Sequence, residues 1–100
     1  MIARHWLGLA KPDQTQPYIH HLRSETFPTL KTIPGFIDAS ILHRPVPRGT
    51  EFLIITRWQS LAAIHAFAGA DAETAVVPDK VQAMMVEYEA KARHYLVEPD

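Results

Sequence analysis

Six histidines in a chain of 100 residues are the clearest sign of chemistry in this sequence. Histidine is the side chain whose unperturbed pKa lies nearest to neutral pH, so it can accept or donate a proton under physiological conditions. The absence of cysteine excludes disulfides, thiolate metal ligands and cysteine nucleophiles. No HExxH, GxGxxG, GxSxG or P-loop motif occurs, which argues against a metal site, a nucleotide cofactor, a serine nucleophile and phosphoryl transfer. Proton transfer by histidine is the chemistry that remains.

His5 and His94 are the two candidates for a catalytic base. Both lie in segments expected to form strands, the first and the last of the chain, and these strands are neighbours in the expected topology, so the two side chains could meet. A histidine on a sheet face that helices cover must find a partner or stay neutral, and such surroundings give a proton acceptor a useful pKa. The alternative is a hydrogen-bonded histidine with a structural role.

His21 and Glu25 lie four residues apart and share one face of an expected helix. They are either a base with its orienting carboxylate or an ion pair on the surface. His20 and His21 point about 100° apart on a helix, so they cannot chelate one metal ion. Among the cations, Arg4 and Arg57 lie on expected strands, where they could pair with a carboxylate such as Asp38 or Glu51, or bind an anionic ligand.

The composition narrows the classes of partner. Lys and Arg number 10 against 11 Asp and Glu, and no block of one sign could follow a phosphate backbone, so a nucleic acid partner is not expected. The first ten residues, MIARHWLGLA, are too short and too polar for a signal peptide or a membrane-spanning helix. We expect a cytoplasmic protein that does not bind membranes.

The first half of the sequence predicts a strand, a helix and a second strand. Residues 2–10 mix apolar and polar types without helical periodicity, which favours a strand. A short helix follows, bounded by Pro17 and Pro28, with a break near Phe27. Residues 36–43 read as the second strand, and the PVPRGT stretch predicts a hairpin into a third strand over residues 52–58.

The second half predicts two helices and a last strand. Ser60 and Gly69 are suited to cap a helix over residues 61–68. After Pro78, a second helical face is predicted because Val81, Met84, Met85 and Tyr88 recur at helical spacing. Residues 92–97 close the chain as a strand.

This order, β-α-β-β-α-β, predicts one α+β domain over residues 1–100 with a ferredoxin-like fold. Its four-stranded antiparallel sheet would carry both helices on one face. The other face, with apolar residues from several strands, would be covered by a second copy of the chain, which predicts a homodimer.

Seven segments spread over most of the chain resemble the antibiotic-biosynthesis monooxygenase-like domains. They are Arg4-His5-Trp6-Leu7-Gly8, residues 18–22, Phe27-Pro28, Ile33-Pro34-Gly35, residues 52–58, Ala66-Phe67-Ala68-Gly69 and His94-Tyr95. The resemblance implies a dimeric α+β barrel of two ferredoxin-like protomers. Members of that family include cofactor-independent oxygenases of phenols or quinols, haem-degrading enzymes and proteins without an assigned activity.

The haem-degrading branch is not expected. Members of that branch are similar to one another in having an asparagine, a tryptophan and a histidine at the site. An ungapped alignment puts Leu7, Phe67 and Val77 at these three positions here. None of the three can ligate iron or donate a side-chain hydrogen bond to bound dioxygen. We therefore expect no cofactor.

The resemblance and the histidines together suggest a cofactor-independent monooxygenase of a small phenolic or quinol-like aromatic compound. His94 or His5 would be the base, and Leu7, Trp58 and Phe67 would wall the pocket, with His21 and Glu25 beside it. The alternative is a non-catalytic dimeric barrel that binds a small apolar ligand or acts as a stress-related accessory protein. A cavity of about a few hundred Å³ lined by one or two histidines favours the enzyme, and a closed core favours the alternative.

Overall fold

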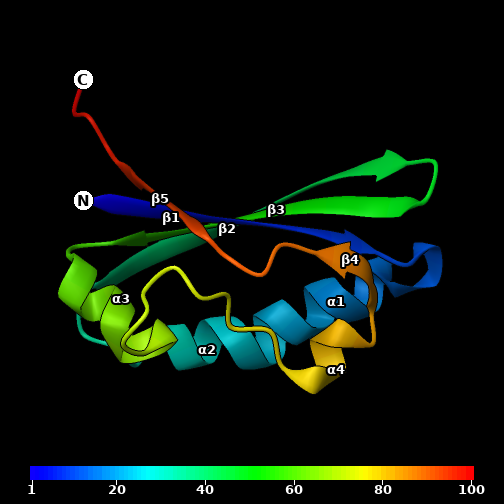
Figure 1. The fold of residues 1–100 in the computed structure, drawn as a ribbon, viewed down its shortest axis with the longest axis horizontal. Coiled ribbons are helices and arrows are strands. Elements are labelled where there is room, and N and C mark those ends of the chain that lie inside the picture. Colours follow the sequence, from blue (N-terminus) through cyan, green and yellow to red (C-terminus); the bar gives the residue numbers. More distant parts are fainter.

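An antiparallel sheet with helices on one face organises the computed structural model, which describes all 100 residues (Figure 1). The strands are β1 (Ile2–Ala10), β2 (Phe36–Val46), β3 (Gly49–Trp58), β4 (Met85–Tyr88) and β5 (Arg93–Leu96). They follow the order β2-β3-β1, and the short strands β4 and β5 both pair with β1, at its two ends. This is the predicted ferredoxin-like α+β fold, with the fourth strand position divided between two short strands.

Side chains on the central strands alternate between a covered and an open face. On β3, Phe52, Ile54, Thr56 and Trp58 are buried on the side of the helices. The register brings the even-numbered residues of β1 onto the same face, because Arg4 lies opposite Thr56. The odd-numbered residues of β1 and β3 point to the open face.

The first helical segment is continuous where the sequence predicts a break. Helix α1 (Thr15–His21) runs through a π-helical turn (Leu22–Thr26) into α2 (Phe27–Leu30). The amide of Phe27 donates to the carbonyl of Leu22, five residues back. Pro28 has no N–H, and its ring would clash with a carbonyl in a regular α-helix, so the wider turn accommodates it without ending the helix.

Helix α3 (Leu61–Ala68) has the predicted bounds and caps. The Ser60 hydroxyl accepts a hydrogen bond from the amide of Ala63 at 3.3 Å. Gly69 follows with φ +87°, a conformation that favours glycine. The predicted hairpin and last strand are also confirmed, the latter to within a residue at each end.

The predicted helical face after Pro78 is wrong. Helix α4 (Asp79–Gln82) is a single turn, and Met85–Tyr88 form strand β4. Met85 pairs with Ala10, and Tyr88 pairs with Gly8. Pairing there satisfies backbone groups of β1 that would otherwise form an open sheet edge, and this gain outweighs the helical spacing of the side chains.

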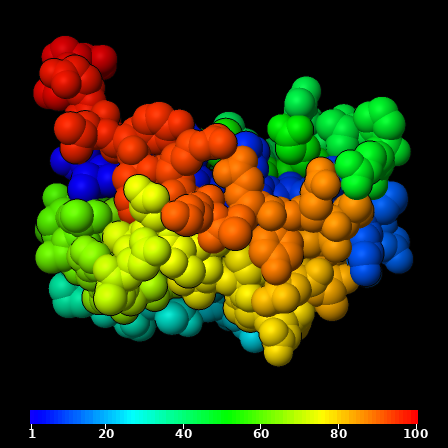
Figure 2. Space-filling model, in the orientation of Figure 1, coloured from blue at the N-terminus to red at the C-terminus, as the bar shows by residue number.

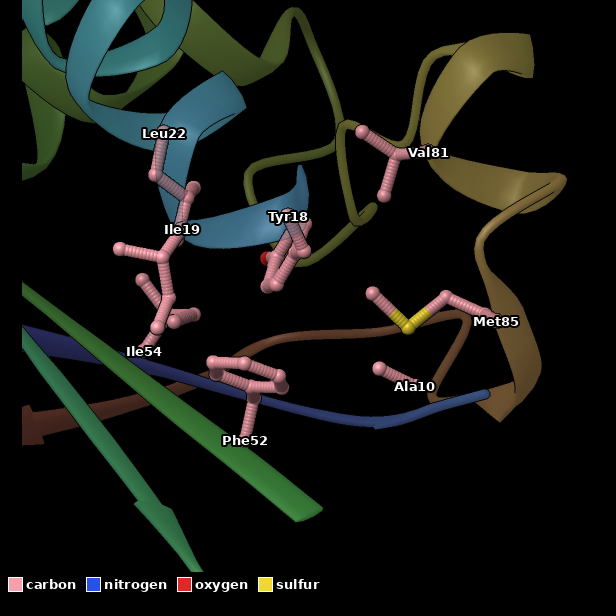
Figure 3. Close-up of a cluster of buried hydrophobic side chains, with 8 residues drawn as sticks. All are labelled: Ala10, Tyr18, Ile19, Leu22, Phe52, Ile54, Val81 and Met85. Carbon is pink, nitrogen blue, oxygen red and sulfur yellow. The ribbon is translucent and has the colours of Figure 1, made fainter. Parts of the chain in front are cut away.

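Two clusters of buried side chains join the sheet to the helices. The larger contains Ala10, Tyr18, Ile19, Leu22, Phe52, Ile54, Val81 and Met85 (Figure 3). The smaller contains Leu30, Trp58, Ala63 and Ile64, near the opposite end of the sheet. Figure 2 shows the chain after α3, yellow to orange, covering one side of the molecule between the sheet and the helices. None of the helices has the length and hydrophobicity needed to cross a membrane.

Candidate active site

A cavity of about 70 Å³ lies between the covered face of the sheet and the helical layer. Its wall has 17 residues, of which 12 are hydrophobic. The segment 75–78, which has no helix or strand, supplies one side of it. The other five are Pro78 and four polar residues, Arg4, His21, Thr26 and Thr56. Tyr18, one of the 12, adds a hydroxyl to the polar groups that could act on a ligand.

Arg4 brings a positive charge to this cavity from strand β1. The side chain is only 5% exposed. Its Nη1 donates to the carbonyl of Ala72 and lies 2.7 Å from Nε2 of His94, and its Nη2 donates to the carbonyl of Thr74 at 2.8 Å. The guanidinium carbon lies 5.7 Å from the centre of the Phe67 ring. Arg4 is therefore held by two carbonyls and one imidazole, and by no carboxylate.

The contact with Arg4 defines the state of His94. A guanidinium has donors and no acceptor, so Nε2 of His94 must accept, and the ring proton sits on Nδ1. Burial, and then the positive charge of Arg4, lower the pKa of His94. Burial also lowers the pKa of the Arg4 guanidinium, which nevertheless stays charged near neutral pH. His94 is thus a neutral imidazole whose lone pair is engaged.

His21 lines the cavity from the end of α1, and its side chain is buried. The predicted contact with Glu25 forms, because Nδ1 of His21 lies 2.9 Å from Oε2 of that carboxylate. Lys80 of α4 donates to the same oxygen at 2.6 Å. These hydrogen bonds, the one from Lys80 first and the one from His21 next, lower the pKa of Glu25.

The pairing of His21 with an ionised carboxylate puts the ring proton on Nδ1. Nε2 of His21 has no hydrogen-bond partner in the protein. Every fully buried polar side-chain atom does have a partner, so Nε2 is not fully buried. The π-helical turn contributes to this arrangement, since Leu22 and Thr26 of that turn also line the cavity. Wide turns of this kind are frequent at functional sites. Nε2 of His21 is therefore available to a ligand.

Tyr18 adds a neutral hydroxyl to the cavity wall. Its ring meets Phe52 edge-on, with 4.8 Å between the ring centres, and lies 6.3 Å from Trp6. The hydroxyl has no hydrogen-bond partner within the protein and is not fully enclosed, and burial of the side chain raises the pKa of Tyr18. The group stays protonated near neutral pH and can donate to a ligand.

His5 and His94 do not meet, although their neighbouring strands made a contact between them possible. His94 pairs with Arg4 on the covered face, whereas His5 points to the open face, where its ring lies 4.8 Å from that of Tyr95. Burial, and then the charge of Arg57, lower the pKa of His5. Successive residues of a strand face opposite sides, which separates the two imidazoles.

The residues predicted to wall the pocket divide into two groups. Phe67 and His21 line the cavity. Leu7 is not part of the wall, because it lies on the open face opposite Leu53. Trp58 is fully buried in the smaller cluster, where its Nε1 donates to Thr56 at 2.9 Å. Glu25 contacts the wall through His21 without lining it.

The sequence reasoning missed Tyr18 and left the partner of Arg4 open. Strand alternation could have placed Arg4, since it puts that residue on the same face as Trp6. Arg57, in contrast, forms the ion pair with Asp38 that the sequence suggested, with 2.8 Å between Nη1 and Oδ1. No group of three or more histidine or acidic side chains is arranged to hold a metal ion.

Comparisons with known proteins agree with this architecture. The sequence model of the family "Antibiotic biosynthesis monooxygenase" matches residues 7–84, and the chain belongs to that family. No curated protein matches the chain.

Three solved structures share the fold. A Bacillus cereus protein assigned as an antibiotic biosynthesis monooxygenase has a TM-score of 0.69 at 19% identity, over 100% of this chain and 94% of that one. A mutant of MhuD with two manganese protoporphyrin IX molecules bound per active site has a TM-score of 0.62 at 18% identity, over 100% and 97%. The monooxygenase ActVA-Orf6 of Streptomyces coelicolor, in complex with nanaomycin D, has a TM-score of 0.59 at 16% identity, over 99% and 86%.

Proposed function

We propose that this protein is a cofactor-independent monooxygenase that oxidises a small phenolic or quinol-like aromatic compound in the cavity between sheet and helices. The observation that supports this proposal most is the composition of the cavity wall. The wall is mainly apolar, and it contains three polar side chains with unused hydrogen-bonding groups, Arg4, Tyr18 and His21. Membership of the monooxygenase family supports the reaction class.

In this proposal His21 is the proton acceptor. Its free Nε2 takes the proton of a phenol, and Glu25 stabilises the resulting imidazolium through Nδ1. The electron-rich phenolate then reduces dioxygen, which needs no cofactor once the phenolate is kept out of water. In the net reaction one oxygen atom of O₂ is inserted at a ring carbon and the other leaves as water, so a phenol becomes a quinone.

The catalytic roles predicted for His94 and His5 stay predictions, and the geometry supports His21 more. Nε2 of His94 is engaged by Arg4, so His94 could take a proton only by releasing the guanidinium. His5 lies on the open face, away from this cavity.

A substrate would need the cavity to open. About 70 Å³ is room for roughly two water molecules. The segment 75–78 is the part of the wall outside regular structure, and Thr74 before it is held by Arg4. We propose that this segment moves outward as the aromatic ring enters, as loops that cover active sites commonly do.

The test is oxygen consumption with a panel of hydroquinones and polyphenols. The expected result is uptake of one O₂ per phenol oxidised, without added metal or nucleotide, and its loss in His21→Ala. His20→Ala is the matched control, because His20 is the exposed neighbour in the same helix. Full activity in His21→Ala would contradict the assignment of the base.

The small cavity also supports the second candidate, a non-catalytic barrel that binds a small apolar ligand. This candidate predicts that aromatic compounds bind without any oxygen uptake. Titration of the same panel, followed by the fluorescence of the two tryptophans, distinguishes it from the enzyme.

We further propose that the functional unit is a homodimer joined through the open face of the sheet. Leu42, Leu53 and Leu7 form one apolar row across β2, β3 and β1 on this face. The charges beside the row already form ion pairs within the chain, Arg44 with Glu51 and Arg57 with Asp38. A second copy of the chain fits such a surface, since the leucine row of one protomer would cover the leucine row of the other. A cytoplasmic location stays a prediction.

A further inference from the structure

We propose that Arg4 is the anion site of the cavity: once Nε2 of His21 has taken the proton of the phenol, the ionised oxygen of the substrate is held on the Arg4 guanidinium as a phenolate. This inference rests on the proposed function and names the group that recognises the substrate. His94 is the positioning residue that fixes the guanidinium in place.

Arg4 is a buried cation without an anionic partner in the chain. The side chain is 5% exposed. Five pairs of lysine or arginine with a carboxylate occur in the chain, and none of them includes Arg4. A charge removed from water is costly unless it is paired and hydrogen-bonded. The carbonyls of Ala72 and Thr74 offset part of this cost as dipoles, but the full charge is left without a counter-ion.

The Arg4 guanidinium has N–H donors that no group of the protein accepts. A guanidinium carries five N–H groups. Three are used, two on Nη1 toward Ala72 and His94 and one on Nη2 toward Thr74. Nε and the second N–H of Nη2 have no partner in the protein. Arg4 is a wall residue of the cavity, and the proposal directs these two donors toward a ligand oxygen there.

The surroundings of the Arg4 guanidinium are apolar. The Phe67 ring lies under the guanidinium, and 12 of the 17 wall residues are hydrophobic. Arg4 is the only lysine or arginine that lines the cavity, so it is the one permanent cation there for an ionised oxygen. Charge attraction is strong where water is excluded, so the neighbouring guanidinium favours the ionised form of a bound phenol.

The role of His94 follows from its hydrogen bond. Its neutral imidazole accepts from Nη1 at 2.7 Å without bringing a charge. A carboxylate at this position would neutralise Arg4 and remove its attraction for a ligand. A neutral acceptor instead orients the guanidinium without neutralising it, so the positive charge of Arg4 can attract an anionic substrate.

The experiment uses p-nitrophenol as the probe, because its phenol and phenolate forms absorb at different wavelengths. It is titrated into the full-length protein at a pH below its own pKa, and p-nitroanisole, which has the same shape without the acidic proton, is the neutral control. Benzoate is the third probe, and it reports a carboxylate in place of a phenolate. The variants are Arg4→Gln and Arg4→Lys, with circular dichroism and thermal unfolding as checks of folding.

We expect bound p-nitrophenol to show the phenolate spectrum in the wild type. Arg4→Gln should weaken its binding by about tenfold or more and should leave the binding of p-nitroanisole unchanged. Arg4→Lys, which keeps the charge, should bind p-nitrophenol with an affinity between those of the wild type and Arg4→Gln. The spectrum of the wild-type complex tests the inference even if Arg4→Gln does not fold.

The opposing outcomes are distinct. If both nitro compounds bind equally well and the phenol stays protonated, Arg4 is not an anion site, while the proposed function stands. If benzoate alone binds in an Arg4-dependent manner, the site takes a carboxylate and the phenolate assignment is wrong. If no probe binds, the cavity is not an aromatic site, and both the inference and the proposed function are contradicted.

Discussion

Arg4 and His94 lie opposite each other on β1 and β5, and Nη1 of the guanidinium is 2.7 Å from Nε2 of the imidazole. Because arginine can only donate, this contact is a donor and acceptor pair that contains a single charge. In this contact His94, which the sequence predicts as a base, accepts a hydrogen bond as a neutral imidazole.

Replacement of His94 separates these two roles. His94→Gln keeps an acceptor that can reach Arg4 but cannot take up a proton, and it should retain most of the oxygen consumption. His94→Ala should lose most of it, with a larger rise in KM than fall in kcat, because the guanidinium is no longer oriented. If both variants are equally inactive, His94 is a base and the positioning role is wrong.

His21→Ala should lower kcat by about 10²- to 10⁴-fold, the usual contribution of a general base. Glu25→Gln should have a smaller effect, because the amide oxygen can still accept from Nδ1 while the charge that stabilises the imidazolium is lost. Steady-state oxygen uptake measures both. An effect of Glu25→Gln larger than that of His21→Ala would show that the carboxylate has another role.

The stability of the folded chain should depend on pH through two histidines. Burial, and then the charge of Arg4, lower the pKa of His94 below 6.5, while Glu73 opposes this shift and His65 adds to it. Burial, and then Arg57, lower the pKa of His5. The unfolded chain therefore binds these protons more readily than the folded chain does.

The contribution is fully present above the ordinary pKa of 6.5 and is lost as the pH falls through the lowered values. Urea unfolding at several pH values should show a falling free energy of unfolding below about pH 6.5. The slope should be smaller in His94→Gln. A free energy of unfolding that is flat or rises on acidification in this range contradicts the prediction.

Leu53→Glu should dissociate the proposed dimer, because it puts a charge at the centre of the apolar row on the open face. Leu61→Glu is the matched control, since Leu61 is 46% exposed on α3, away from that face. Sedimentation of the wild type at micromolar concentration should give about twice the chain mass of 11.3 kDa. A well-folded wild-type monomer would contradict the dimer.

Added haem should give no stoichiometric complex and no reductant-dependent loss of the Soret band. Leu7 lies on the open face, Phe67 and Val77 present only apolar atoms to the cavity, and about 70 Å³ cannot hold a porphyrin. The free Nε2 of His21 is the one imidazole nitrogen on the wall able to ligate iron. A complex that His21→Ala abolishes would therefore contradict the prediction and identify the ligand.

Local signals in the sequence were sufficient for much of the fold. Ser60 and Gly69 predicted the limits of α3 because both caps act within one turn of the chain. The prediction failed for Met85–Tyr88, whose spacing suits a helix but whose partner, residues 8–10, lies far away in the sequence. Long-range strand pairing of this kind has no signal in a window of neighbouring residues.

The candidate site was predicted in part for the same reason. The His21–Glu25 contact is local and was predicted from spacing. The Arg4–His94 pair joins residues 90 positions apart, and it needs both the register of β1 with β5 and the face that each residue occupies. The sequence predicted the neighbouring strands but not that register, so it suggested His5 where Arg4 lies.

The π-helical turn at Leu22–Thr26 has a consequence for how the chain tolerates insertions and deletions. A π turn completes one rotation with one residue more than an α turn, so deletion of a single residue there would leave an ordinary α turn with α1 and α2 in nearly the same rotational phase. His21 and Leu30 would keep their faces, but the ring of Pro28 would then press on a carbonyl of the preceding turn. Variants that are one codon shorter in this stretch should therefore retain the proposed proton acceptor and have a lower free energy of unfolding.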